Sequence, residues 1–501
     1  MNVSPESGAQ APADPRRWLA LAVTLVAMAL DLIDTTIVNV ALPQIQRDLG
    51  ASESALQWVA AGYTLAFALS LITAGRIGDI VGRKRMFFIG VTGFVIFSAL
   101  CGAANGIEML IAFRVFQGVS AAIIMTQGLS LFQVMFPPQE RAAVFGMFGA
   151  LTGLAAVIGP IAGGLLVNWN IAGLDWRPIF LINVPIGILA LIGAAAWIRE
   201  SKAPHAQRLD IVGVVLVTAA LVAILYPLVQ GRELGWPLWT YLSMIASVPL
   251  FGIFALWEKG KERRDGSALV ATTLFKRRAY VGGLMVLLIF FASVGGFFFP
   301  FTLYLQLGEG FSPLAAGLTI APFSVGAGIT SAVSIQLASK FGRKILALGM
   351  LVMALGIGLV MLTIYLAGHP SAWQLIPALV VAGLGMGFVI SPMVEIILAG
   401  VPTQHAGSAS GTLNTADQLG AASGVAIVGT VFFGLLGGAA ALGDPASLGA
   451  KFTHATYGAL WFEVGLLILG FFVTFLLPKM PRQQEWPSAE SPEKAAELEA
   501  A

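Results

Sequence analysis

The sequence predicts an all-α integral membrane protein with fourteen transmembrane spans, arranged as two six-helix bundles with two central helices inserted between them. Three observations support this class. Of the 501 residues, 57% are hydrophobic and 11% are charged, whereas about a quarter of the residues of a soluble domain are charged. Long apolar runs recur along the whole chain. Lys and Arg gather in alternate loops between these runs, as they do in membrane proteins.

The spans follow from length, because a helix needs about 20 mostly apolar residues to cross a bilayer. The first run starts at Trp18 after a polar leader. It is longer than the core of a secretory signal, which has about 7 to 15 residues, so we interpret it as a retained span. The predicted spans cover residues 18–42, 55–76, 86–105, 109–133, 142–167, 178–198, 210–230, 238–257, 280–305, 313–338, 345–367, 373–400, 407–436 and 457–478.

The distribution of positive charge tests this count. With an even number of spans, both ends of the chain lie on one side of the membrane, and most Lys and Arg fall in the loops on that side. The exceptions are Arg47, Arg177, Arg232 and Lys451, which fall in the opposite loops, and Arg114, which lies within a span. A miscounted span would spoil this separation. We therefore expect a multi-pass protein of the cell membrane with both termini in the cytoplasm.

A short repeat divides the chain into two halves. Ile80–Lys84 follows the second span as Lys340–Lys344 follows the tenth, and both contain Gly-Arg-Lys. Paired halves of this kind place the substrate near the membrane midplane. The expected organisation is a disordered leader (1–17), a first six-helix bundle (18–200), two inserted spans with their linkers (201–279), a second six-helix bundle (280–480) and a disordered tail (481–501).

Five motifs carry a resemblance to a known family. Gly75–Arg85 reads Gly-Arg-Ile-Gly-Asp-Ile-Val-Gly-Arg-Lys-Arg and resembles the loop after the second span in the major facilitator superfamily. Asp34–Pro43 and Trp176–Pro185 resemble signatures of its fourteen-span drug:proton antiporters, the multidrug and quaternary-ammonium exporters. Arg114–Gly118 is similar to a proton-linked motif, and Gly159–Gly164 to a motif associated with antiport. The resemblance covers the whole chain by span count.

The resemblance implies a proton-coupled antiporter that exports amphipathic, cationic drugs or toxic compounds by alternating access. Its expected partners are a small-molecule substrate, protons and the lipid bilayer, joined in some relatives by a periplasmic adaptor protein. We expect a monomer with no cofactor, no metal and no nucleic-acid partner. Cys101 is the single cysteine, which excludes an internal disulfide and a cysteine metal cluster.

Other functional classes fit the sequence less well. The chain lacks a Gly-x4-Gly-Lys-Ser/Thr loop, a His-Glu-x-x-His pair and a Gly-x-Ser-x-Gly elbow, so the sequence disfavours an ATPase and a membrane-embedded enzyme. A transporter of the same fold that exports one specific metabolite stays open as an alternative, as does a uniporter. Nothing in the sequence decides between a drug and a metabolite as the substrate.

Arg114 is the costliest residue to place, since a cation in a span costs about 2.5 to 3.5 kcal/mol. Asp34 lies nine residues before Pro43, and Arg114 lies six residues after Glu108. At 1.5 Å per residue, both fall roughly 9 to 14 Å below the outer surface, so the two can pair. We expect Asp34 to carry the proton and Arg114 to favour its charged form. Asp31, one helical turn earlier, is either a second proton site or a group solvated by the central cavity.

The expected substrate contacts combine polar residues of both halves. Asp417 lies about ten residues inside its span and has two polar neighbours at helical spacing. The set expected to bind substrate is Asp417, Asn414, Gln418, Gln117 and Asn39. Glu463 lies near the outer end of a peripheral span, and we assign it no role.

Two glycine-containing segments are expected to form a conformational gate. In the first, glycines let helices approach and Asp79 can pair with a guanidinium or a helix N-terminus, although the cations there also serve to fix topology. In the second, a proline and several glycines permit a bend and close packing. The gate residues are Gly75, Asp79, Gly82, Arg83, Lys84, Gly153, Gly159, Pro160, Gly163 and Gly164.

Overall fold

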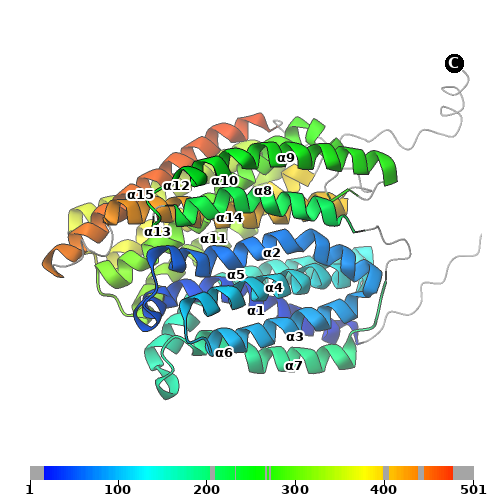
Figure 1. Cartoon of the computed structure of the whole chain (residues 1–501), viewed down its shortest axis with the longest axis horizontal. Coiled ribbons are helices and arrows are strands. Elements are labelled where there is room, and N and C mark those ends of the chain that lie inside the picture. The colour runs from blue at the N-terminus through cyan, green and yellow to red at the C-terminus, as the bar shows by residue number, and fades with distance from the viewer. Residues whose placement is uncertain are drawn as a thin grey trace, which may run out of the picture.

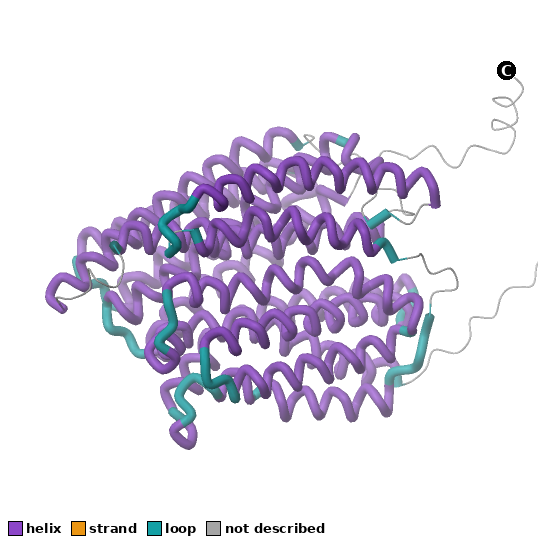
Figure 2. Tube along the Cα trace, in the orientation of Figure 1, coloured by secondary structure: helices purple, strands orange, loops and turns teal. Residues whose placement is uncertain are grey.

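The computed structural model describes residues 16–202, 209–231, 233–265, 268–269, 272–398, 406–437 and 445–477. The predicted leader, apart from residues 16 and 17, and the whole predicted tail lie outside these ranges. Helices make up nearly all of the described chain, and short connections join them at the two ends of the molecule (Figure 2). We call the end where α1 begins the termini end and the other the opposite end.

The first half contains the helices of the first six predicted spans. They are α1 (Arg17–Leu49), α2 (Glu53–Val81), α3 (Arg83–Gly102), α4 (Ile107–Met135), α5 (Pro138–Trp169), α6 (Pro178–Leu181) and α7 (Asn183–Trp197), with the last two forming one span. Figure 1 shows these helices grouped together in the lower part of the view. Their packing partners lie mainly within this set, with α4 against α2 and α3, and α7 against α1 and α3.

The rest of the chain contains the inserted pair and the second half. The inserted helices are α8 (Ile211–Gln230) and α9 (Leu238–Asp265), which pack on each other. The second half contains α10 (Arg278–Leu303), a π-helical extension η3 (Tyr304–Gly308), α11 (Pro313–Phe341), α12 (Arg343–Ala367), α13 (Ala372–Leu398), α14 (Ala406–Leu436) and α15 (Pro445–Val473). The proposed domain boundaries between these groups stay a prediction.

The predicted membrane architecture is confirmed. In the described residues, thirteen helices are long and apolar enough to cross a membrane. The remaining predicted span, 142–167, coincides with α5, a helix of 32 residues. Several side chains of α5 lie outside the described residues, and its apolar part is described only over Val157–Trp169. The chain is thus a multi-pass membrane protein, and its inserted pair is the most exposed part, with Leu242 and Ile245 on the surface.

Two helix ends differ from the expectation. We expected a loop at 75–85, but α2 continues through Val81 and a single residue, Gly82, separates it from α3. Gly82 has a φ of 128°, and the equivalent Gly342 between α11 and α12 has a φ of 54°. Both values lie in a region of φ that favours glycine. The Gly-Arg-Lys repeat of the sequence therefore marks the same kind of helix break in both halves. In addition, α15 begins at Pro445, twelve residues before the predicted span at 457.

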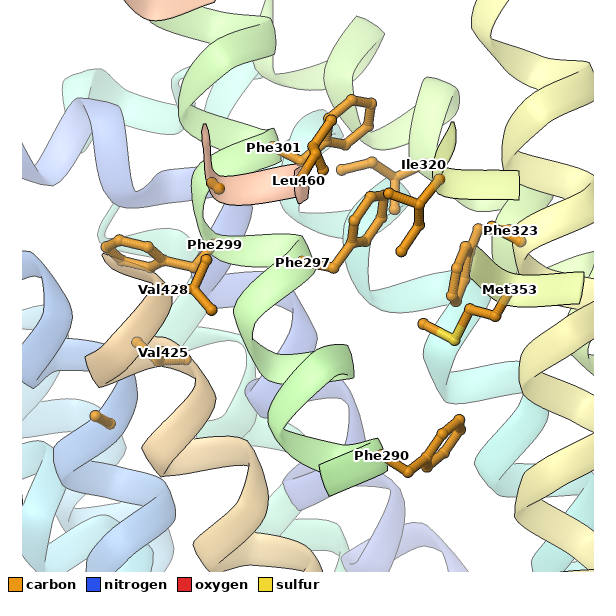
Figure 3. Close-up of a cluster of buried hydrophobic side chains, with 14 of the residues drawn as sticks. Phe290, Phe297, Phe299, Phe301, Ile320, Phe323, Met353, Val425, Val428 and Leu460 are labelled. Carbon is orange, nitrogen blue, oxygen red and sulfur yellow. The ribbon is translucent and has the colours of Figure 1, made fainter. Parts of the chain in front are cut away.

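A continuous apolar core surrounds α10 in the second half. Phe297 and Phe301 stack on each other on one side of α10, with ring centroids 5.1 Å apart, whereas Phe299 points away from them towards α14 (Figure 3). Phe297 stacks on Phe323 of α11 with ring centroids 5.7 Å apart. Phe299 meets Phe433 of α14 edge to face. These contacts join α10 to its neighbours in the second half, of which α14 and α15 are the main packing partners.

The two halves meet along two pairs of helices. α5 packs against α11, and α2 packs against α14. The inserted pair lies over the second of these contacts, because α8 touches both α2 and α14. The inserted helices therefore cover one of the two seams between the halves.

Candidate functional site

Asp34 lies at the centre of a buried polar cluster in the first half. Its carboxylate is fully buried, at 0% exposed, and Arg114 of α4 is 2% exposed. The guanidinium of Arg114 donates from Nη1 to Asp34 Oδ2. The other carboxylate oxygen, Oδ1, accepts from Gln117 Nε2 at 3.1 Å and from Asn183 Nδ2 at 3.0 Å. One buried acid therefore holds one cation and two amide donors.

Arg114 has further partners besides Asp34. Its Nε donates to the carbonyl oxygen of Val59 at 3.2 Å, and its Nη1 also donates to Gln117 Oε1 at 2.9 Å. The guanidinium carbon lies 4.0 Å from the centroid of the Tyr63 ring. A cation over an aromatic face is attracted by the ring quadrupole. Contacts from α1, α2 and α4 together therefore offset the free-energy cost of burying this cation.

Asp31 is connected to the same cluster by Tyr63. The Tyr63 hydroxyl donates to Asp31 Oδ1, while the ring of Tyr63 lies under Arg114. Gly118 permits this arrangement, because a Cβ on it would lie 2.4 Å from the Tyr63 carbonyl oxygen. Any side chain at Gly118 would push α2 away from α4 and take the Tyr63 ring away from Arg114.

Three members of the cluster had no predicted role in it. Ser98 of α3 accepts from Gln117 Nε2 at 2.8 Å and from Asn183 Nδ2 at 3.4 Å, and Tyr63 links the two acids. Asn183 lies within Trp176–Pro185, one of the segments with a family resemblance, which was its only signal. Ser98 carried no signal, because a serine in an apolar run has many uses.

The residues expected to bind substrate lie in two places. Gln117 belongs to the Asp34 cluster and is fully buried. Asn39 is half-buried on α1 and donates to the Thr35 carbonyl oxygen at 3.4 Å. Asn414, Asp417 and Gln418 are half-buried together on α14, in the second half.

The expected gate segment in α5 lies where three helices meet. A Cβ on Gly159 would overlap the Thr36 hydroxyl of α1, and one on Gly163 would lie 3.0 Å from the Ile37 carbonyl oxygen. Gly164 comes equally close to the backbone of Leu314 at the start of α11. Gly153 lies earlier in α5, and its surroundings fall outside the described residues. Small residues therefore bring α5 into backbone contact with both halves.

Pro160 takes part in the same contact from the other side. A Cβ on Gly317 of α11 would lie 2.2 Å from the Pro160 carbonyl oxygen. Nearby, Gln306 of η3 donates to the carbonyl oxygen of Val40 at 2.7 Å, and Gln44 donates to Gln306 Oε1 at 3.3 Å. These contacts close the halves against each other towards the opposite end.

The expected gate residues at the termini end connect helices within the first half. Asp79 Oδ1 accepts from Arg83 Nη2 at 2.8 Å. The Glu200 carboxylate, just after α7, accepts from the backbone N–H groups of Lys84 and Arg85 at 3.1 and 3.2 Å, as an anion does at a helix N-terminus. A Cβ on Gly82 would lie 2.6 Å from this carboxylate, whereas Gly75 has open space around it.

The second half repeats this arrangement with different groups. Arg343, at the start of α12, donates from Nη1 to the Phe475 carbonyl oxygen at 2.7 Å and also to that of Leu477. In both halves, therefore, the start of the third helix is attached to the end of the sixth. Arg76 of α2 extends further and donates to the Ala268 carbonyl oxygen, in the linker after the inserted pair.

Comparison with known proteins gives a consistent result. The family model described as Major Facilitator Superfamily matches residues 24–425. The chain is 49% identical to a "Probable actinorhodin transporter" of Streptomyces coelicolor, over 85% of this chain and 74% of that protein. It is 36% identical to a puromycin resistance protein of Streptomyces alboniger, over 94% and 93%. It is 33% identical to a tetracenomycin C resistance and export protein of Streptomyces glaucescens, over 84% and 77%.

A solved structure shares the fold. It is that of a bacterial homologue of the human lysosomal transporter Spinster in an inward-facing and occupied conformation. It matches with a TM-score of 0.66 at 16% identity, over 92% of this chain and 97% of that one.

Proposed function

The chain belongs to the major facilitator superfamily, and from this premise we propose that it is a proton-coupled antiporter that exports amphipathic, cationic drug-like compounds by alternating access. The observation that carries the proposal is the buried Asp34–Arg114 ion pair, together with the two amide groups that donate to the other Asp34 oxygen. Buried ionisable groups in a membrane protein are costly and mark ion pathways or proton relays.

The relatives support export of a drug-like substrate. Those named above are an actinorhodin transporter, a puromycin resistance protein and a tetracenomycin C resistance and export protein. The puromycin resistance protein matches over almost the whole of both chains. The actinorhodin transporter, at 49% identity, favours a second candidate, in which the chain exports one specific metabolite.

The proposed proton step uses the geometry of the first half. Asp34 is stable as a carboxylate while Arg114, Gln117 and Asn183 all donate to it. These donors belong to α4 and α7, whereas Asp34 belongs to α1. A movement of α1 relative to α4 would leave the carboxylate buried without a counter-ion. Such a charge is very costly in an apolar surrounding, so Asp34 would take up a proton. Tyr63 would connect Asp31 to the same step.

The proposed conformational change opens and closes the contact between the halves. The α5–α11 contact and the Gln44–Gln306 hydrogen bond join the halves towards the opposite end, and we infer that they keep that end closed. Export requires the same contacts to separate. Substrate would then bind between the halves at Asp417, Asn414 and Gln418, and Asn39 of α1 would contribute a further contact nearer the opposite end.

The proposed orientation places the termini end in the cytoplasm of the cell, across the cytoplasmic membrane. Its support is the group of cations there, which includes Arg76, Lys84 and Arg85. Reporter fusions at both ends of the chain test the orientation, because cytoplasmic and external reporters become active on different sides.

Proton movement in everted membrane vesicles tests the function. In respiring vesicles loaded with a pH-sensitive dye, adding ethidium or another lipophilic cation should release protons if this chain is present. Asp34→Asn should abolish the response. Asp175→Asn is the matched control, because Asp175 is exposed and has a φ of 49° that asparagine tolerates. A full response from Asp34→Asn would overturn the proton assignment. No response to any cation from correctly inserted protein would favour a dedicated metabolite exporter.

A further inference from the structure

A cavity of about 720 Å³ lies between the inserted helices and the two halves. Its walls come from α2, α8, α9, α10 and α14, together with the η2 turn (Thr272–Lys276). On α8 the lining residues lie within the first seven residues, and on α10 they lie within the first eleven. At 1.5 Å per residue, the cavity occupies the half of the membrane nearer the termini end.

The cavity separates into an apolar body and a charged rim. Leu69, Val217, Phe254, Leu288 and Leu419 are typical of the body. The rim carries charges of both signs, from Glu258, Lys259, Glu262, Arg263 and Lys276. Phe251 and Phe275 line the cavity and are also exposed on the surface of the molecule. A molecule in the surrounding leaflet therefore has direct access to the cavity.

Of the two acids in the rim, Glu258 is buried between the inserted helices and Glu262 is half-buried. Glu258 of α9 is 1% exposed. A Cβ on Gly213 of α8 would lie 2.4 Å from Glu258 Oε1 and 2.8 Å from Asp210 Oδ2, so the two carboxylates approach each other at the first turn of α8. On the facing helix, the Thr73 hydroxyl lines the cavity, and its oxygen is buried without a hydrogen-bond partner in the described structure. The cavity thus offers both a negative region and an unused hydroxyl.

The cavity is separate from the proposed substrate residues. On α14, Thr412, Thr415, Ala416 and Leu419 face the cavity. Asn414, Asp417 and Gln418 lie more than 100° around the helix from the centre of that face, at 100° per residue. One helix therefore stands between the cavity and the proposed transport path.

We propose that this cavity binds a phospholipid whose headgroup combines a phosphate with a primary amine, the phosphatidylethanolamine class. One of its acyl chains lies against the apolar body of the cavity. The ammonium group of the headgroup lies at Glu258 and Glu262, and the phosphate lies at Arg263 and Lys276. Charge complementarity selects this occupant, because a rim with adjacent acids and bases matches a zwitterion better than a simple cation or anion. The bound lipid fastens the inserted helices to the α2–α14 seam.

Native mass spectrometry of the full chain, purified in mild detergent, tests the proposal. The wild type should retain one phosphatidylethanolamine, and Leu69→Trp, which fills the cavity, should lower its occupancy at least about tenfold. Val248→Trp is the matched control, because Val248 is an exposed α9 residue outside the lining, and it should retain the lipid. Equal retention by the wild type and Leu69→Trp, with both folded by size-exclusion chromatography, would overturn the proposal.

A headgroup comparison provides a readout that does not depend on filling the cavity. Phosphatidylethanolamine should bind at least about tenfold more tightly than phosphatidylcholine with the same acyl chains, because methylation removes the N–H donors to the carboxylates. Glu258→Gln should remove most of this preference. Equal binding of the two lipids would contradict the headgroup assignment. Displacement of the lipid by ethidium would also contradict the proposal, since it would place the cavity on the transport path.

Discussion

The Asp34–Arg114 pair makes a quantitative prediction about stability. Each residue is buried, and each depends on the other for charge compensation. In Asp34→Asn the Arg114 cation stays buried without an anion, and in Arg114→Gln the Asp34 carboxylate stays buried without a cation. Removing one partner of a buried pair costs about 3 to 5 kcal/mol. We expect each single variant to lose that much of the free energy of unfolding.

The double variant should lose much less than the sum of the two losses. With both residues neutral, no charge remains at the site, and the amides of Gln117 and Asn183 can hydrogen-bond to the new side chains. We expect a coupling free energy of at least about 2 kcal/mol, within the range for residues in direct contact. Reversible unfolding by SDS titration, followed by tryptophan fluorescence of the four proteins, measures it.

The Arg177–Asp48 pair near the opposite end is the matched control. Its atoms are 2.8 Å apart, but its side chains are 20% and 33% exposed. Exposed pairs contribute about 0.2 to 1 kcal/mol, so the cycle of Asp48→Asn and Arg177→Gln should give a coupling below about 1 kcal/mol. If the cycle at Asp34 and Arg114 is additive within about 0.5 kcal/mol, the reasoning about the buried pair is refuted.

Three further predictions concern the second half and its contact with the first. Gly317→Val should lower transport at least about tenfold, because its side chain meets the Pro160 backbone. Gly328→Val, which meets nothing within 4 Å, should stay near wild type, and equal activity of the two would count against the proposed α5–α11 gate. Glu463→Met should raise the free energy of unfolding by about 1 to 3 kcal/mol, because the Glu463 carboxyl is fully buried and the Ser293 hydroxyl beside it does not complete a hydrogen bond of good geometry. An SDS titration that shows a loss of stability would contradict this. Gln306→Leu removes a hydrogen bond to the α1 backbone, which is worth about 0.5 to 1.5 kcal/mol. The variant should therefore increase thiol labelling of a cysteine placed between the halves at the opposite end. Unchanged labelling would exclude a role of Gln306 in closing that end.

The sequence predicts the position of a helix well where the apolar segment and the helix have the same ends. It predicts the position poorly where the helix extends beyond the apolar segment. The predicted span 313–338 begins at the first residue of α11, Pro313, because the serine before it caps the helix and proline suits the first turn. The start of α15 at Pro445 was missed, since residues 445–456 mix Lys, His and Thr with apolar residues. That segment is too polar to be predicted as a span, yet nothing in it breaks a helix.

The candidate site divides in the same way. Depth along a helix follows from residue counts, so the meeting of Asp34 and Arg114 could be predicted from two charged residues at equal depth. The contributions of Ser98, Asn183 and Tyr63 depend on how α2, α3 and α7 are rotated about their axes. Rotation is set by packing against neighbouring helices, which a single sequence does not specify. In addition, burying a neutral polar side chain costs much less free energy than burying a charge, so the sequence alone does not indicate that such a residue needs a partner.

Asp34 in the first half and Asp417 in the second have different surroundings, and this difference bears on the proposed coupling. Asp34 accepts from three donors, so a substrate cation would have to displace Arg114 to reach it. Asp417 is half-buried, and the described structure shows no hydrogen bond or ion pair to it. A substrate cation gains the most binding free energy from an acid that has no partner. The cost of removing such an acid from water has already been met on folding, so binding does not add it again. This favours substrate at Asp417 and the proton at Asp34. With the two acids in separate halves, substrate and proton would then compete through the movement of the halves, without sharing a carboxylate.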